Sequence, residues 1–166
     1  MNVFKKIAFA LLLVTLAACK GEAEQDDRWR PVDIHGKLQV KGRYLCNEKG
    51  EPITLRGVSY GWHNLWPRFY NAQTVKWLKN DWQCSVLRAA MGCYDGVEDG
   101  YMVNPEFALD CIAKVVQASI DEGVYVIIDW PAHDFYPTEA KAFFGSMARK
   151  YGKDPNVMYE LFNEPT

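Results

Sequence analysis

The stretch Val124-Tyr-Val-Ile-Ile-Asp-Trp130 decides the fold of this 166-residue chain. It is a continuous apolar run, which is typical of a strand buried on both faces of a parallel sheet. Similar runs begin near residues 54, 85 and 157, so the four starts are 31, 39 and 33 residues apart. Each interval contains one helical pattern, so we expect neighbouring strands to be parallel, with right-handed connections.

Three helical patterns separate these strands. The first covers residues 74–82, and the third begins at Thr138 and stops at Gly152. The second is the clearest, because Asn104 can cap its start and Pro105 suits its first turn. Gly123 is expected to end it. One helix therefore lies in each crossover.

Residues 33–52 alternate loosely and carry a turn signal at residues 47–50, which predicts a β-hairpin ahead of a first strand at residues 53–60. The four strands suit either half a barrel or an open doubly wound sheet. No Gly-x-Gly-x-x-Gly follows the first strand, which weakens the dinucleotide-binding alternative. Polar and aromatic residues instead follow all four strands, as a barrel enzyme requires. We expect an α/β fold, a (β/α)8 TIM barrel, of which residues 33–166 form the N-terminal half.

The N-terminal 18 residues have the layout of a secretory signal, with two lysines, an apolar run and small residues. The segment Leu16-Ala-Ala-Cys19 also resembles a bacterial lipobox, in which the cysteine is lipidated; the alternative is an ordinary signal followed by a chance cysteine. The polar and acidic residues 19–32 are expected to form a flexible tether. We therefore expect an exported protein, lipid-anchored to the outer membrane or cell surface, with a periplasmic or secreted location as the alternative.

Charge and cysteine content exclude several partners. Without residues 1–18 the chain has 17 basic and 21 acidic residues, a formal charge of −4, and no evident basic patch, so nucleic acid is not an expected partner. No Cys-x-x-Cys or His-Glu-x-x-His occurs, so neither a metal site nor a cofactor is expected. An oxidising compartment allows disulfides, but spacing fixes no pairing, and buried free thiols suit two of the later cysteines, Cys84 and Cys111.

The residues that carry chemistry lie at strand ends. Glu164 follows the apolar run 157–162, where an acid costs free energy unless it has a partner or a function. The amide of Asn163 can bind a substrate hydroxyl while Glu164 faces a leaving group. Arg88 interrupts the apolar strand 85–91, and its planar fork suits a carboxylate. Arg88 either forms a structural ion pair or keeps a nucleophilic carboxylate ionised.

Six stretches of the chain, taken together in this order, resemble glycoside hydrolase family 5 endoglucanases of the bacterial cellulase branch. The resemblance covers nearly all of residues 33–166, and the set is far more specific than any one member. The stretches are Leu55-Arg-Gly-Val-Ser59, Trp77-Leu-Lys-Asn-Asp-Trp82, Val86-Leu-Arg-Ala-Ala-Met91, Tyr125-Val-Ile-Ile-Asp-Trp130, Glu139-Ala-Lys-Ala-Phe-Phe144 and Tyr159-Glu-Leu-Phe-Asn-Glu-Pro165.

The resemblance implies a (β/α)8 barrel and retaining cleavage of β-1,4-glucan. It makes Glu164 the general acid/base, Asn163 a ligand of the sugar 2-hydroxyl, and Arg88 a support for the nucleophile. A retaining enzyme needs a second carboxylate about 5 Å from the first. In the family that glutamate ends the seventh strand, which this chain lacks, so the 166-residue piece is expected to be inactive.

Five further residues are candidates for binding the β-linked glucan by stacking and hydrogen bonding. They are Trp62, His63, Trp66, Tyr94 and His133. Ordinary loop packing is the alternative, and for Trp66 the two readings are even.

One departure from the family pattern affects activity. The family usually has histidine directly after Ile-Ile-Asp-Trp, where this chain has Pro131. His133 lies two residues further on, but the missing role is not assigned to it. Pro131 keeps a second function open, a non-catalytic surface glycan-binding lipoprotein. Mannan, xylan and mixed-linkage glucan also stay open as substrates of a related enzyme.

Overall fold

The computed structural model describes residues 29–94, 96–134 and 136–163. The predicted signal, Cys19, Glu164 and all of the tether before Trp29 lie outside these residues. None of the described helices combines the length and apolar character that a membrane span needs. In chain order the described elements are α2 (Pro31–His35), β1 (Gln39–Lys41), β2 (Tyr44–Cys46), β3 (Gly57–Trp62), the 3-10 turn η1 (Pro67–Phe69), α3 (Ala72–Trp82), β4 (Val86–Ala90), α4 (Pro105–Glu122), β5 (Tyr125–Asp129), α5 (Pro137–Tyr151) and β6 (Val157–Glu160).

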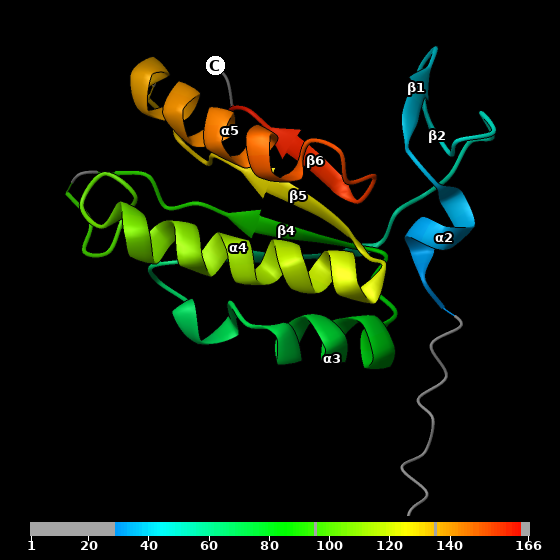
Figure 1. Ribbon diagram of the computed structural model, residues 1–166, viewed down its shortest axis with the longest axis horizontal. Coiled ribbons are helices and arrows are strands. Elements are labelled where there is room, and N and C mark those ends of the chain that lie inside the picture. The colour runs from blue at the N-terminus through cyan, green and yellow to red at the C-terminus, as the bar shows by residue number, and fades with distance from the viewer. Residues whose placement is uncertain (1–28, 95, 135, 164–166) are drawn as a thin grey trace, which may run out of the picture.

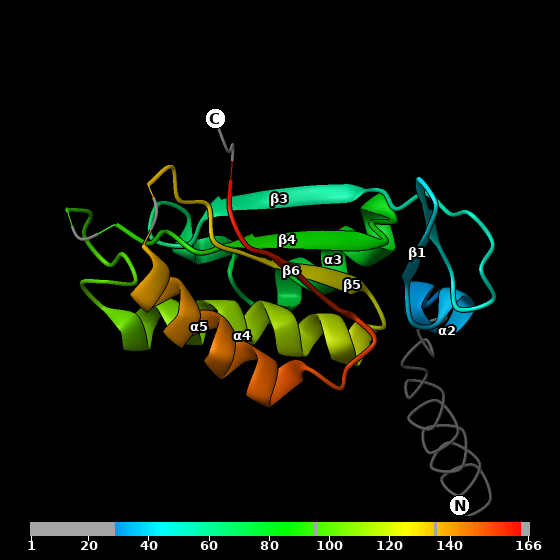
Figure 2. The ribbon, with the colours of Figure 1, turned by 90° about the horizontal axis from the view of Figure 1, so that it is seen from above.

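The main sheet has four parallel strands in the order β3-β4-β5-β6, as the strand spacing predicted. The helices α3, α4 and α5 lie on one face of this sheet (Figures 1 and 2). Alternate residues of each strand point into that layer, and Leu87, Val126 and Ile128 are completely buried there. Burial of these apolar side chains is the main favourable term that joins the helices to the sheet.

Helix α4 begins and ends where its sequence predicted. The Asn104 side chain accepts a hydrogen bond from the Phe107 amide at 3.3 Å and so caps the first turn. Gly123 ends the helix with φ 68°, a left-handed conformation that glycine adopts without steric cost. The chain then enters β5 directly, so the caps of α4 help to set the position of that strand.

The structure corrects three details of the N-terminal region. The hairpin β1–β2 is present, but it turns at residues 42–43, where Gly42 has φ 60°, and not at residues 47–50, which form a second turn after β2. Strand β3 begins at Gly57 and not at Ile53, because the Ile53 amide donates to Leu45 of the hairpin at 2.9 Å. The short helix α2 was not predicted and spans the expected boundary at residue 33.

The helix α2 and the hairpin lie beyond the amino-terminal ends of the sheet strands (Figure 1). The Val32 amide donates to the Gly123 carbonyl at 3.0 Å, and the Tyr125 hydroxyl donates to the Gly36 carbonyl at 2.5 Å. These bonds tie the N-terminal segment to the end of α4 and the start of β5. The opposite, carboxyl-terminal end of the strands stays free of this segment.

The second face of the sheet has no covering helix among the residues that the structure describes (Figure 2). Its strands present Ser59, Arg88 and Ile127 in one row, since these residues are register partners across β3, β4 and β5. The two outer strands, β3 and β6, each have one edge without a partner strand in the described region. This open face is therefore the side on which polar strand residues are accessible.

Candidate active site

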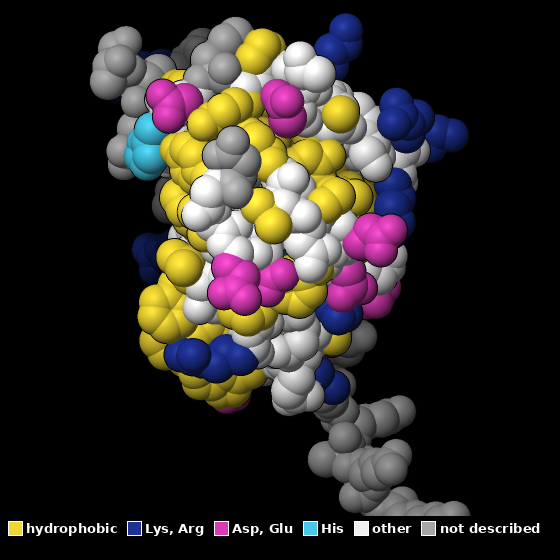
Figure 3. Space-filling model, turned by 90° about the vertical axis from the view of Figure 1, so that its left-hand side faces the viewer, with side chains coloured by type: hydrophobic (Ala, Val, Ile, Leu, Met, Phe, Trp, Pro, Cys, Tyr) yellow, Lys and Arg dark blue, Asp and Glu magenta, His cyan; other side chains and the backbone are white. Residues whose placement is uncertain are grey.

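The candidate site lies at the carboxyl-terminal ends of β3 to β6. Figure 3 shows the end of the molecule toward which these strands point, with many hydrophobic side chains and acidic side chains among them. Loops that follow the strands surround this end (Figure 1). Parallel strands in register bring their last residues to one edge of the sheet, and Asp129 and Glu160 are register partners there.

Arg88 is the centre of a charged cluster on the open face. Its Nε donates to Glu160 Oε2 at 2.8 Å, and its Nη2 donates to Glu160 Oε1 at 2.9 Å. A second carboxylate, Asp129 Oδ2, lies 2.8 Å from Nη2. The Arg88 Nη1 donates to Ser59 Oγ at 3.2 Å. The prediction that Arg88 meets a carboxylate is thus met by two acids that sequence reasoning had not assigned to it.

Asp129 has an unusual environment for a carboxyl group. Its side chain is completely buried, and its contact with Arg88 has ion-pair distance but not hydrogen-bond geometry, so neither oxygen is hydrogen-bonded among the described residues. Burial raises the pKa of Asp129 to about 7; the charge of Arg88 lowers it and that of Glu160 raises it. The pKa of Arg88 is raised, chiefly by its hydrogen bonds to Glu160. Asp129 therefore titrates near neutral pH.

The cluster extends to the residue that precedes the predicted acid/base. Arg88 Nη2 donates to Asn163 Oδ1 at 3.3 Å. Asn163 thus lies on the open face beside the carboxyl-terminal end of β6. Glu164 itself, which follows Asn163 in the chain, is outside the described residues, and its assignment stays a prediction.

Two of the predicted aromatic residues lie together after the carboxyl-terminal ends of β3 and β4. The rings of Trp62 and Tyr94 have centroids 5.3 Å apart, and the Tyr94 hydroxyl accepts a hydrogen bond from the His133 amide at 2.7 Å. A further ring, Tyr136, meets Tyr94 edge-on at 5.9 Å. Tyr136 was not predicted, although its position just before α5, in a loop that follows a strand, is a signal that could have identified it.

Trp66 lies apart from this aromatic group. Its side chain is 43% exposed, and the guanidinium of Arg68 lies 5.2 Å from its ring. The ring also packs over Gly61, where a Cβ atom would come within 3.0 Å of it. Both readings of Trp66 therefore have support, since part of the ring packs on a loop and part is free for stacking.

His63 packs into the loops, which was the stated alternative to sugar binding. Its side chain is fully buried, Nδ1 accepts from the Gly92 amide at 3.0 Å, and Nε2 lies 2.9 Å from the Asp99 carbonyl. Because Nδ1 is an acceptor, Nε2 carries the proton and donates to Asp99. Burial lowers the pKa of His63, against the opposing hydrogen bond to Asp99. In this geometry both ring nitrogens form hydrogen bonds with the loop backbone.

Pro131 follows β5 at the position where the family usually has histidine. It is buried, and the Ala132 amide donates to the Trp130 carbonyl at 2.8 Å, which closes a three-residue turn around the proline. The fixed φ of proline suits the centre of such a turn. His133 is exposed two residues further on. The chain thus leaves β5 through a tight turn without an imidazole at its apex.

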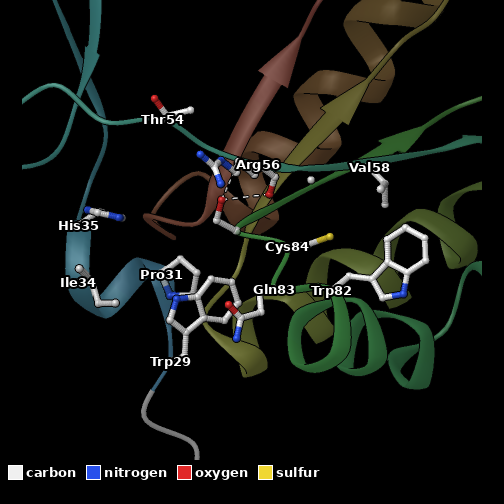
Figure 4. Close-up of a pocket in the computed structure, with 12 residues that line it drawn as sticks. Trp29, Pro31, Ile34, His35, Thr54, Arg56, Val58, Trp82, Gln83 and Cys84 are labelled. Atoms are coloured by element: carbon white, nitrogen blue, oxygen red, sulfur yellow. Dashed lines mark hydrogen bonds between the residues drawn. The ribbon is translucent and has the colours of Figure 1, made fainter.

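One cavity is remote from this site. It has a volume of about 590 Å³ and lies between α2, the segment before β3 and the loop that joins α3 to β4 (Figure 4). Trp29, His35, Arg56 and Trp82 are among its lining residues, which include no carboxylate. It is at the amino-terminal end of the strands, so it lacks the acids that the candidate chemistry needs.

The four cysteines beyond Cys19 are buried free thiols: Cys46, Cys84, Cys93 and Cys111. Burial raises the pKa of the Cys93 thiol to about 12. Within the described ranges, no group of three His, Cys, Asp or Glu side chains could hold a metal ion. The described residues around Arg88 offer carboxyl, guanidinium and amide groups.

Residues 46–166 match the sequence profile of the cellulase family, glycosyl hydrolase family 5. The chain belongs to glycoside hydrolase family 5. It is 38% identical to an endoglucanase of Clostridium saccharobutylicum over 99% of this chain and 38% of that protein. It is also 44% identical to endoglucanase Z of Dickeya dadantii over 77% of this chain and 30% of that protein.

Solved structures agree with the family assignment. A structure from Cytophaga hutchinsonii superposes with a TM-score of 0.77 at 45% identity, over 82% of this chain and 44% of that chain. The catalytic domain of Thermobifida fusca endoglucanase Cel5A superposes with a TM-score of 0.74 at 33% identity, over 82% and 46% of the two chains. The likeness to family 5 cellulases confirms the predicted TIM-barrel class. The chain spans less than half the length of each of these relatives.

Proposed function

We propose that the whole protein is an endo-β-1,4-glucanase that cleaves β-glucan with retention of configuration. The observation that carries the proposal is the contact between Arg88 Nη2 and Asn163 Oδ1 at 3.3 Å, in a family 5 chain whose next residue is Glu164. The contact joins a cation and a carboxamide on the open face of the sheet. The aromatic pair Trp62 and Tyr94 follows β3 and β4 and adds a surface on which a sugar could stack. A variant of the Thermobifida fusca catalytic domain was solved with cellotetraose, which supports a β-linked glucan as the ligand class.

In the proposed mechanism Glu164 protonates the leaving glycosidic oxygen while a second carboxylate attacks the anomeric carbon. Glu164 then removes a proton from water, and the water hydrolyses the glycosyl-enzyme. Asn163 holds the sugar 2-hydroxyl, a contact that strengthens in the oxocarbenium-like transition state. Arg88 supports the attacking carboxylate in its ionised form.

We propose that residues 1–166 alone do not hydrolyse glucan. The second carboxylate must lie about 5 Å from Glu164 in a retaining enzyme. Among the described residues, Asp129 and Glu160 both contact Arg88 on the open face and are poorly placed to attack a sugar. The nucleophile is therefore expected from outside this chain segment.

The test is a reducing-sugar assay on carboxymethylcellulose with the complete reading frame. We expect Glu164→Gln to lower kcat by about 10²- to 10⁴-fold, because proton transfer to the leaving group is lost. The matched control is Glu106→Gln, which removes an exposed glutamate from the first turn of α4 and should leave kcat unchanged. Equal activity of wild type and Glu164→Gln would refute the assignment.

Pro131 favours a second candidate, a surface protein that binds glycan without cleaving it. The proline removes an imidazole from the end of β5 and fixes a tight turn there. Retained binding of cellotetraose without hydrolysis, in wild type and in Pro131→His, would support the binding protein. A large gain of activity in Pro131→His would instead identify an enzyme weakened by proline. The same assay on mannan, xylan and mixed-linkage glucan distinguishes the related hydrolases.

We also propose that the protein is exported and anchored by a lipid on Cys19. The support is sequence alone, namely the apolar run before Leu16-Ala-Ala-Cys19 and the acidic segment after it. Radiolabelled palmitate should enter the wild-type protein in its bacterial host and not the Cys19→Ala variant. Equal labelling of both proteins, or none in either, would contradict lipidation at this cysteine.

A further inference from the structure

The terminal nitrogen Nη2 of Arg88 has more acceptors around it than it has hydrogens. Glu160 Oε1 lies at 2.9 Å, Asp129 Oδ2 at 2.8 Å and Asn163 Oδ1 at 3.3 Å. A guanidinium Nη carries two N–H groups in a fixed plane. Only two of the three acceptors can receive a good hydrogen bond at one time, so the third is weakened.

The bond to Glu160 is the fixed member of this set. Glu160 receives both Nε and Nη2, at 2.8 and 2.9 Å, in the two-pronged geometry that sets the plane of a guanidinium. The side chains of Arg88 and Glu160 are 24% and 34% exposed, so the pair is partly screened from water. Glu160 therefore determines where the remaining Nη2 hydrogen points.

Asp129 and Asn163 are the competing members. Asp129 has no exposed side-chain surface and no hydrogen bond of good geometry among the described residues, so its charged form is costly unless Nη2 turns toward it. Asn163 has the longer and weaker contact. A charged Asp129 attracts the guanidinium hydrogen more strongly than a neutral amide does, whereas a protonated Asp129 leaves that hydrogen to Asn163.

We propose that Glu160 is a positioning residue for Arg88, and that the proton on Asp129 decides whether Arg88 holds Asn163, the residue that precedes Glu164 in the chain. The proposal rests on the proposed function, because Asn163 matters only if it binds the sugar. It gives the site a built-in dependence on pH that does not come from the acid/base itself. Asp129 serves this role through its neighbours and does not contact substrate.

Other titratable groups face Asp129 and enter the same balance. They are Arg88 on β4, Glu160 on β6, Cys93 after β4 and Tyr70 before α3. Burial raises the pKa of both the Cys93 thiol and the Tyr70 hydroxyl, so these two stay neutral through pH 5 to 9. The proton on Asp129 is thus the variable in this range.

The experiment measures kcat and KM against pH for the complete protein and three variants. Glu160→Gln should lower kcat at least about tenfold with KM within about twofold, because misplacing Arg88 affects the transition state more than binding. The control is Glu122→Gln, the same change in the pair Lys79–Glu122, whose Glu122 is 23% exposed. A kcat of Glu160→Gln equal to that of the control would overturn the positioning role.

Asp129→Asn tests the competition. Asparagine has the shape of the neutral acid and no proton to lose, so its kcat should match wild type below about pH 6 and exceed it above about pH 8. Both proteins keep the same predicted acid/base, so the difference between their two pH profiles reports Asp129. Superimposable profiles would overturn the competition.

A second readout separates this inference from the proposed function. The Arg88 side-chain N–H signals, assigned by their absence in Arg88→Lys, should shift with pH near 7 in the wild type and stay constant in Asp129→Asn. If the wild-type protein hydrolyses no glucan, the proposed function fails and these signals alone decide the inference. Signals that do not titrate in the wild type would overturn it.

Discussion

The two faces of the four-stranded sheet differ in what covers them and in the side chains that they carry. The helix-covered face is apolar and closed within the described residues, with Leu87, Val126 and Ile128 fully buried. The open face carries a guanidinium with two carboxylates, and one of these, Asp129, is buried without a good hydrogen bond to any described residue. Buried polar groups are normally satisfied, and exceptions concentrate at functional sites. The contrast assigns stability to one face and chemistry to the other.

The helix layer also contains an ion pair, which can be compared with the Arg88 cluster on the open face. Lys79 Nζ donates to Glu122 Oε2 at 2.9 Å and so joins α3 to α4. This pair is remote from the strand ends. Similar chemistry on the open face extends from Arg88 to Asn163, the neighbour of the predicted acid. The pair on the open face also contacts Asn163, the residue that we propose binds the sugar.

The largest effect is expected from Phe143→Ala on the covered face. Phe143 is fully buried in α5, with its ring 5.4 Å from that of Trp130 and 5.6 Å from that of Tyr101. Truncation should lower the free energy of unfolding of the complete protein by about 4 kcal/mol. Denaturant unfolding measures this, and kcat per folded molecule should stay constant. A fall in kcat with intact folding would show that the helix-covered face also contributes to activity.

Arg88→Lys should have the next largest effect, on activity. Lysine keeps the charge but cannot form the two-pronged bond to Glu160, so the contact with Asn163 is lost. We expect kcat to fall about 100-fold, which corresponds to about 2.7 kcal/mol, while the midpoint of unfolding changes little. An active Arg88→Lys enzyme would show that the cluster is a structural ion pair only.

Asp129→Asn should change how stability depends on pH. The folded pKa of Asp129 is about 7, above the ordinary value of 3.8, so the folded state holds the proton more tightly than the unfolded state. Its contribution is therefore complete below about pH 4 and is lost as pH rises toward 7 and beyond. Relative to Asp129→Asn, wild type should lose about 1.4 kcal/mol per pH unit between pH 4 and 7. Parallel stability curves would contradict the raised pKa.

The sequence predicted the covered face better than the open one. The apolar run 124–130, the cap Asn104 and the stop Gly123 are local signals, and the structure confirms β5 and both ends of α4. The predicted start of β3 was wrong because the Ile53 amide bonds to Leu45 of the hairpin and not to the neighbouring strand of the main sheet. No local sequence pattern shows which of these two partners a residue takes. Local periodicity specifies an element, but its partner depends on the whole fold.

The site was predicted in part for the same reason. Arg88 and Asn163 stood out because polar residues end apolar strands, and the structure brings the two together. Glu160 and Asp129 were missed as partners of Arg88, since only the parallel register brings the ends of β4, β5 and β6 together. For His63 the sequence left sugar binding and loop packing open, and its burial depends on contacts with Gly92 and Asp99, which local sequence does not reveal.

The smallest effect is expected from the helix caps, and it tests the comparison where the two regions meet. Asn104 caps α4 and also donates to Asp99 Oδ1 at 2.9 Å, while Asn71 caps α3 by accepting from the Thr74 amide at 2.9 Å. Each change to alanine should cost about 1 kcal/mol in unfolding free energy. Only Asn104→Ala also releases the loop whose Asp99 carbonyl accepts from His63, so only this variant should raise KM for cellotetraose. A rise in KM of equal size for Asn71→Ala would show that the loops at the strand ends depend on the whole helix layer and not on this one contact.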